Sequence, residues 1–181
     1  MTGVATPFSH LAVPLALALA LGSDSVPPGL MALALVCAVL PDIDALGLWL
    51  GIPYDHPFGH RGFTHSLPFA VLLAGAGTLL APSLGSEPLS AFAVLLVCAV
   101  SHGLIDALTN GGLGVAFFSP LSYRRSFLPW RVIEVSPLRP SELFSRQGLR
   151  VLRSELRWVW LPCAVLALLG WGLRGVAGWN A

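Results

Sequence analysis

Apolar residues gather in five runs along the chain, and short polar stretches separate them. The runs cover residues 10–22, 30–51, 67–82, 89–108 and 158–178. The fourth and fifth reach the roughly 20 residues that a helix needs to cross a bilayer, whereas the first and third are shorter. A short run can still cross the bilayer if its helix continues into the polar residues on either side. If it does not, the run is half-buried or re-entrant. The pattern therefore predicts an all-α membrane bundle with four or five spans.

The first run has a second interpretation as a cleaved secretory signal. It is a short apolar stretch followed by Ser23, Asp24 and Ser25. A secretory signal begins with a positively charged region, and residues 1–9 contain no Arg or Lys. The sequence favours a retained helix.

The composition supports the membrane interpretation. Of the 181 residues, 55% are hydrophobic and only 10% are charged, and the mean hydropathy is +0.77. A soluble domain of this size usually carries about 25% charged residues. The composition therefore argues against a disordered chain, a coiled coil and a nucleic-acid-binding protein. The lipid bilayer is the expected partner. The three cysteines each lie alone in an apolar run, where they act as small hydrophobic residues.

The placement of charge orients the predicted helices. All ten cations are arginine, and the hairpins after the first and third runs carry only Asp24 and Glu87. Short cytoplasmic loops are enriched in Arg and Lys, so with five spans the N-terminus and the two Arg-bearing loops are expected in the cytoplasm. Arg61 lies in the shorter of these loops. The longer one carries Arg124, Arg125, Arg131, Arg139, Arg146, Arg150, Arg153 and Arg157.

The end of the long loop has the pattern of a basic amphipathic helix. Apolar positions 149, 152, 156 and 159 share one helical face, and arginines at 146, 150, 153 and 157 share another. Two interpretations stay open: a solvated helix with one core face, or a helix lying on anionic headgroups. The chain is thus expected to form a single membrane domain, 1–181. It comprises a motif-bearing core (1–130), a basic cytoplasmic loop with this interfacial helix (131–157) and a last span (158–181).

Polar side chains inside apolar runs are costly, so their positions suggest function. His102 and Asp106 are four residues apart in the fourth run and share a helical face. Such a pair either offers a metal two ligands or forms a buried hydrogen bond. Asp42 and Asp44 follow Pro41 at the end of an otherwise uncharged apolar stretch. They either meet a cation or are solvated in a turn that ends the helix.

The stretch His60-Arg61-Gly62-Phe63-Thr64-His65-Ser66 precedes the third run. Thr64 or Ser66 is suited to cap the following helix, whereas no structural requirement accounts for both histidines. Arg61 is placed to bind an anionic group, or else it is only a cytoplasmic charge. With the predicted topology, seven ligand-type side chains converge on one membrane face. A metal site is therefore expected from His10, Asp42, Asp44, His60, His65, His102 and Asp106.

Three motifs also resemble those of the YdjM-like family of inner-membrane proteins, which are described as membrane-bound metal-dependent hydrolases. They are Pro41-Asp42-Ile43-Asp44, the block from Gly59 to Ser66, and Ser101-His102-x-x-x-Asp106-x-x-Thr109, and His10 matches a histidine near the family's N-terminus. The resemblance covers about Ser9 to Trp130. It implies a multi-pass protein of the inner membrane with a divalent metal, expected to be zinc.

The family is in turn distantly similar to zinc-dependent phospholipase C and related nucleases, and the His-x-x-x-Asp pair is the shared element. The resemblance implies His102 and Asp106 as ligands, with Asp42 or Asp44 and His60 or His65 beside them. Those enzymes take further ligands from downstream, whereas no histidine follows His102 here. One or two ions are expected, not a cluster of three.

The expected function is a metal-dependent hydrolase at the cytoplasmic face, acting on a small-molecule or lipid phosphoester or another lipid-linked substrate. Asp42 or Asp44 would take a proton from water, and Arg61 would neutralise charge on the substrate. Two alternatives stay open. One is a non-catalytic protein with a structural metal site, and the other is a divalent-metal transporter, whose site should lie near the bilayer midplane.

Overall fold

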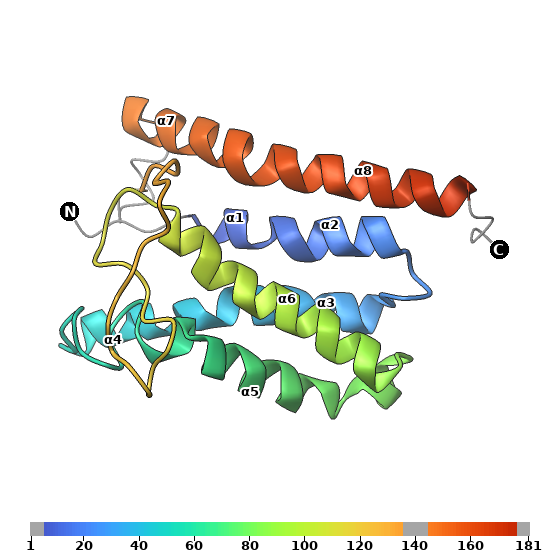
Figure 1. Cartoon of the computed structure of the whole chain (residues 1–181), viewed down its shortest axis with the longest axis horizontal. Coiled ribbons are helices and arrows are strands. Elements are labelled where there is room, and N and C mark those ends of the chain that lie inside the picture. The colour runs from blue at the N-terminus through green and yellow to red at the C-terminus, as the bar shows by residue number, and fades with distance from the viewer. Residues whose placement is uncertain (1–5, 136–144, 177–181) are drawn as a thin grey trace.

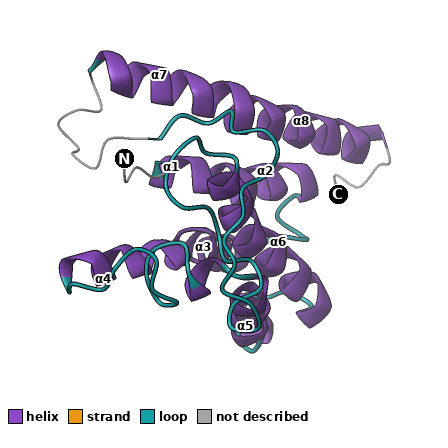
Figure 2. Ribbon diagram, turned by 60° about the vertical axis from the view of Figure 1, so that its left-hand side comes forward, coloured by secondary structure: helices purple, strands orange, loops and turns teal. Residues whose placement is uncertain are grey.

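The computed structural model describes residues 6–135 and 145–176, and the elements in these ranges are helical (Figures 1 and 2). The described residues form no strand beyond isolated bridges at Thr109–Ile133 and Val115–Ser126. The predicted all-α class is confirmed; Arg139 and Trp179 lie outside the described residues. The helices are α1 (Pro7–His10), α2 (Ala12–Leu21), α3 (Pro28–Val39), α4 (Ala45–Trp49), α5 (Leu67–Thr78), α6 (Pro88–Ala107), α7 (Arg146–Glu155) and α8 (Leu161–Val176). Shorter turns are η1 (Leu40–Asp44), η2 (Phe63–His65), η3 (Ala81–Leu84) and the π-helical η5 (Leu156–Trp160).

Each of the five apolar runs forms helix. Three continuous helical segments of the described chain are long and apolar enough to cross a bilayer: Pro28–Trp49, Pro88–Ala107 and Arg146–Val176. The other two runs form the shorter apolar helices Pro7–Leu21 and Leu67–Thr78. The fold is thus a membrane helical bundle of the predicted kind.

The bundle is built around α6. It packs on α3 and α5 on one side, while α2 packs along α8 on the other (Figure 1). The main apolar core joins α3, α5 and α6 and includes Leu30, Leu95, Cys37 and Cys98. The two core cysteines are buried as predicted, and Cys163 is only half-buried.

The outer face of α8 is apolar and exposed. Ala167 is its one buried residue, whereas leucines along the rest of the helix lie open. An exposed apolar face of this length is stable in contact with lipid chains and not with water. The exposed set includes Leu161, Val165, Leu166, Leu168, Leu169 and Leu173.

The second run differs from its sequence-based description at the aspartate pair. The segment does not end at Asp44, because it continues through η1 into α4 and reaches Trp49. Pro41 lies in the first turn of η1 and has no N–H to donate, so the α-helix tightens there into a 3₁₀ turn. Asp42 and Asp44 therefore lie on a distorted turn inside a longer helical segment.

The amphipathic helix before the last span is confirmed as a helix, and its four apolar positions are not all buried. The buried side of α7 consists of Gly148, Val151 and Glu155. Of the apolar positions singled out in the sequence, Val159 is buried, whereas Leu149 and Leu156 are 47% and 54% exposed. Glu155 is buried because it accepts hydrogen bonds from the backbone N–H and the hydroxyl of Thr6, at 2.6 and 2.7 Å.

The two ends of the bundle differ in charge. One end holds the start of α1, the end of α4 and α7, and the arginine-bearing connections lie there (Figure 1). The opposite end holds the α2–α3 and α5–α6 connections and the end of α8. At that end Arg174 donates to the Leu19 carbonyl at 2.8 Å. The metal-ligand candidates all lie at the arginine-bearing end.

Candidate metal centre

Four segments meet at the arginine-bearing end and bring the predicted site residues together. The 3₁₀ turn η1 supplies the two aspartates, the loop before α5 supplies two histidines and an arginine, α6 supplies a histidine and an aspartate, and α1 supplies one histidine. Almost all of these side chains are buried. The residues are Asp42, Asp44, His60, Arg61, His65, His102, Asp106 and His10.

Two glycines permit the close approach of these segments. A Cβ atom at Gly62 would lie 2.3 Å from the Pro57 carbonyl oxygen, and one at Gly103 would lie 2.8 Å from the His65 carbonyl oxygen. The histidine loop therefore folds tightly and rests on α6 beside His102. Ser66 then caps α5 as predicted, because its hydroxyl accepts from the Phe69 N–H at 3.2 Å.

Four side-chain atoms form a compact group at the centre. They belong to Asp42, His65, His102 and Asp106. His65 Nε2 lies 3.0 Å from His102 Nε2, 3.1 Å from Asp106 Oδ2 and 3.6 Å from Asp42 Oδ1. His102 Nε2 lies 3.5 Å from Asp42 Oδ1 and 3.8 Å from Asp106 Oδ2. Four atoms arranged tetrahedrally around Zn²⁺ would be about 3.3 Å apart, so this spacing fits one ion.

Buried polar atoms without partners support the same assignment. Asp42 Oδ1 and Asp106 Oδ2 are buried without a well-aligned hydrogen bond, and the nearest polar atoms to them are imidazole nitrogens of the same group. A buried carboxylate oxygen left unpaired costs free energy, so a ligand is expected at such a point. The two unpaired oxygens belong to the tetrahedral group.

The outer nitrogens of the two central histidines are held by acceptors. His102 Nδ1 lies 2.7 Å from the Ala38 carbonyl oxygen, which can only accept, so Nδ1 carries the proton. His65 Nδ1 lies 3.0 Å from Asp44 Oδ2. This arrangement leaves each Nε2 lone pair facing the centre, as in metal-binding histidines whose other nitrogen is held by a carboxylate or carbonyl.

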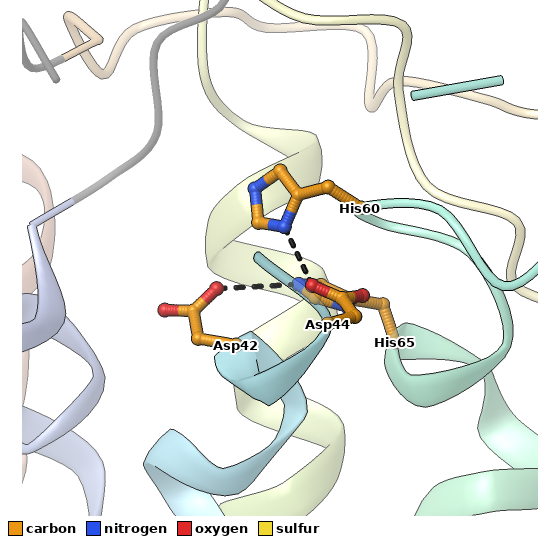
Figure 3. A group of neighbouring side chains, drawn as sticks. All are labelled: Asp42, Asp44, His60 and His65. Atoms are coloured by element: carbon orange, nitrogen blue, oxygen red, sulfur yellow. Dashed lines mark hydrogen bonds and ion pairs between the residues drawn. The ribbon is translucent and has the colours of Figure 1, made fainter. Parts of the chain in front are cut away.

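A second possible ligand group overlaps the first. It consists of Asp42, Asp44, His60 and His65, and thus shares two residues with the central group (Figure 3). His60 Nδ1 lies 2.6 Å from Asp44 Oδ1, while His60 Nε2 is buried without a partner. The residues could therefore hold one ion in the central group, or two ions in neighbouring groups.

His10 lies against the centre but in neither group. Its ring stacks on that of His102 with centroids 3.8 Å apart, and its Nε2 is 4.0 Å from Asp106 Oδ1. Both nitrogens of His10 are buried and lack a hydrogen-bond partner. The sequence-based grouping of His10 with the other ligands is thus matched by proximity, while its role as a ligand stays a prediction.

Arg61 is oriented differently from the sequence-based expectation of a substrate-binding arginine. It is fully buried, and its guanidinium donates to Asp106 Oδ1 at 3.0 Å, to the Thr109 hydroxyl at 2.9 Å and to the Gly111 carbonyl at 3.0 Å. Its backbone has φ of 61°, an uncommon conformation for a residue other than glycine. These contacts fit Arg61 as a residue that positions Asp106.

Sequence reasoning did not identify two supporting residues. Arg125, counted there only as a loop charge, donates to the carbonyls of His60 and Tyr54, each at 2.8 Å. Burial lowers the pKa of Arg125, and Tyr54 and nearby carboxylates oppose this effect. Thr64 donates to Asp44 Oδ2 at 2.5 Å. Neither contact has a local sequence signal, because each joins residues far apart in the chain.

The charge of His65 depends on its carboxylate neighbours. Burial opposes the imidazolium form, but Asp106, Asp42 and Asp44 outweigh burial and hold the pKa of His65 well above its ordinary value. A bound cation would replace that proton.

Asp42 is the most exposed side chain of the central group. The carboxyl group of Asp42 is 22% exposed, whereas the side chains of His65, His102 and Asp106 are at most 1% exposed. Imidazole and carboxylate donors together suit Zn²⁺ and similar divalent metals. The residues present therefore fit a divalent metal ion, with Asp42 the most exposed of the four side chains.

Comparison with known proteins agrees with this picture. The family model described as "YdjM inner membrane protein" matches residues 5–180. Inner membrane protein YbcI of Escherichia coli K12 is 41% identical over 174 residues, covering 93% of this chain and 98% of the relative. Inner membrane protein YdjM of the same organism is 37% identical over 87 residues, covering 44% of each chain. No solved structure matches, and the relatives' names state a location but no activity.

Proposed function

The chain belongs to the YdjM family of inner membrane proteins, and on this premise we propose that it is a membrane-bound metal-dependent hydrolase. Its substrate would be a small-molecule or lipid phosphoester, or another lipid-linked molecule. Its ion would be zinc, in one or two copies, and no nucleic-acid partner is expected.

The observation that carries this proposal is the overlap of the two ligand groups at Asp42. Asp42 belongs to both groups and is their most exposed member. A structural zinc site saturates its ion with protein ligands, whereas a catalytic site keeps a position for water or substrate. A site with more candidate ligands than one ion needs, approached at one side, is the arrangement that hydrolysis requires.

In this proposal the contacts of Asp42 and Asp44 decide which of the two acts as the base. A divalent ion, when bound, lowers the pKa of water toward about 7 and polarises a phosphoryl oxygen. Asp44 is already engaged by His60, Thr64 and the backbone N–H of Arg61. The Asp42 side chain is less engaged and is 22% exposed, so in this proposal it is the better candidate to accept a proton from attacking water.

Arg61 acts in this proposal through Asp106. It fixes one carboxylate oxygen and neutralises part of the negative charge at the centre, and this support leaves the other oxygen directed at the histidines. Substrate phosphate would then be bound by groups at the Asp42 side and not by Arg61.

We also propose that the site faces the cytoplasm. The support is the concentration of arginine at the site end, against Asp24, Glu87 and Arg174 at the other end. The same location disfavours a transporter, since the ligands lie at one end of the bundle and not near its middle.

A structural metal site is the second candidate. It is favoured by the nearly complete burial of His65, His102 and Asp106, which a closed site would share. Such an ion would tie η1, η2 and α6 together without any turnover.

The deciding experiment measures metal content and hydrolysis on the same detergent-purified protein. We expect stoichiometric zinc and metal-dependent hydrolysis of at least one member of a panel of phosphomonoesters, phosphodiesters and phospholipids, lost with chelator and restored by zinc. Replacement of Asp42 by Asn should lower turnover by about 100-fold or more, as for the loss of a general base. Stoichiometric zinc with no hydrolysis across the panel would support the structural site instead.

A further inference from the structure

An apolar groove of about 630 Å³ opens beside the end of α6. Its walls are the last turn of α6, the segment 128–132 and the π-helical turn η5. The volume lies within the range of about 300–1,000 Å³ that is usual for small-molecule sites. The lining side chains are all apolar: Leu108, Leu128, Pro129, Trp130, Val132 and Trp158.

Backbone hydrogen bonds hold the wall of the groove in place. The Leu128 N–H donates to the Ala107 carbonyl at 2.9 Å, and the Ile133 N–H donates to the Leu108 carbonyl at 3.1 Å. The segment between them is thus fixed to the end of α6 at both of its ends. A groove with a fixed wall binds a ligand with little ordering cost.

The groove lies at the height where the spanning helices end. One wall begins where α6 stops at Ala107, and the other lies just before the exposed apolar face of α8 at Leu161. Trp130 and Trp158 in its lining are 73% and 45% exposed. Tryptophan prefers this boundary between lipid chains and headgroups. The groove therefore opens where a lipid chain and its headgroup meet.

Two arginines are sequence neighbours of residues that line the groove. Arg157 precedes Trp158, and its guanidinium lies 5.2 Å from the centre of the Trp158 ring. Arg131 lies in the sequence between the lining residues Trp130 and Val132, and its guanidinium lies 3.8 Å from the centre of the Phe127 ring. Among the described residues, Arg61 is the one arginine that forms an ion pair with a carboxylate.

Two carboxylates lie close in the sequence to these arginines. Glu155 is buried and accepts from Thr6, and Glu134 lies three residues beyond Arg131 in the same segment. Neither glutamate forms an ion pair with Arg131 or Arg157 among the described residues.

We propose that this groove binds an anionic phospholipid. One acyl chain lies along the apolar lining, and the phosphate is held by Arg131 and Arg157 at the rim. Apolar contact supplies affinity for the chain, and guanidinium groups bind phosphate with charge-assisted hydrogen bonds. The site is separate from the metal centre, so it requires neither a bound ion nor hydrolysis.

The test compares two lipids with the same acyl chains, phosphatidylglycerol and phosphatidylcholine, added to the full-length protein in detergent micelles and measured by native mass spectrometry. We expect phosphatidylglycerol to bind about tenfold more tightly. The double variant R131A/R157A should lose that preference, because both lipids carry a phosphate and differ in net charge, and the two guanidinium groups attract the lipid with net negative charge. The matched control R150A/R174A removes the same charge elsewhere and should keep the preference.

Three results would overturn the proposal. Equal binding of the two lipids would show that the rim does not select an anion. Equal losses in the two double variants would assign the effect to overall charge. Displacement of phosphatidylglycerol by glycerol 3-phosphate at similar concentration would show a site for phosphate that makes no use of the groove.

Discussion

Arg61 binds one oxygen of the Asp106 carboxylate and leaves the other facing the histidines. The guanidinium lies 3.0 Å from Oδ1, while Oδ2 lies 3.1 Å from His65 Nε2. Both side chains are fully buried. A carboxylate that would otherwise be an isolated buried charge is thereby held ionised and aimed at the centre.

Replacement of Arg61 by Ala should destabilise the protein and weaken metal binding. Loss of one partner of a buried ion pair costs about 3–5 kcal/mol, because the remaining charge is left uncompensated. Thermal unfolding in detergent and zinc content would measure the two effects, with Arg150→Ala as a surface control. If the Arg61 variant kept wild-type stability and zinc content, the result would support the substrate-binding role that the sequence suggested for Arg61.

Replacement of His102 by Ala should remove most of the bound zinc while the protein still inserts in the membrane. The His102 Nε2 atom is part of the tetrahedral group, and its Nδ1 is fixed by the Ala38 carbonyl. The matched control is His56→Ala, because His56 is exposed and belongs to neither ligand group. Equal zinc content in the two variants would refute the assignment of the centre.

Replacement of Asp44 by Asn should lower zinc affinity by about 10–100-fold without removing a central ligand. Residues that orient metal-binding histidines from outside have effects of this size. Asp44 lies 3.0 Å from His65 Nδ1 and 2.6 Å from His60 Nδ1. Competition with a chromogenic chelator would give the affinity. A complete loss of zinc would make Asp44 a direct ligand, and no change would leave its contacts without a role in binding.

Zinc binding should weaken as the pH falls. The pKa of His65 is raised in the metal-free protein, because its carboxylate neighbours outweigh the effect of burial. Above that pKa, His65 is neutral and free to bind. Below it, a proton must leave first, so the affinity should fall by up to about tenfold per pH unit. Zinc titrations between about pH 6 and 8.5 would show this slope, and an affinity independent of pH would contradict it.

A cysteine placed at Ser126 should react with a membrane-impermeant alkylating reagent only from the cytoplasmic side, and one at Ser83 only from the outside. Both serines are exposed, and the segments that hold them, the α5–α6 connection and the loop after α6, lie at opposite ends of the bundle (Figure 1). Cys163 is half-buried and should be replaced by Ala, whereas Cys37 and Cys98 are buried. The reverse labelling pattern would place the metal centre outside the cytoplasm.

The sequence predicted the helices better than it predicted contacts between them. Hydropathy alone located the five apolar runs, because burial in lipid requires long apolar stretches with few charges. The His102 and Asp106 pair was recognisable because helical spacing is local. The contacts of Arg61 were not, since Asp106 and Thr109 are 45 and 48 residues away in the chain.

The sequence left the buried face of α7 open for a related reason. Periodicity separates apolar from charged faces but does not show which surface meets protein and which meets lipid. Glu155 is buried only because Thr6, 149 residues earlier, donates to it twice. The leucines that would form the core face of a soluble helix were free to point outward.

The distribution of the ligands over η1, η2 and α6 also sets an order of events during synthesis. A ribosome delivers Asp42 first, then His65, and completes the set only when Asp106 has emerged. Until α6 is inserted beside α3, the nascent polypeptide has at most part of a coordination sphere. On the proposed function, full-strength zinc binding would therefore report that η1, η2 and α6 have come together, before α7 and α8 are complete.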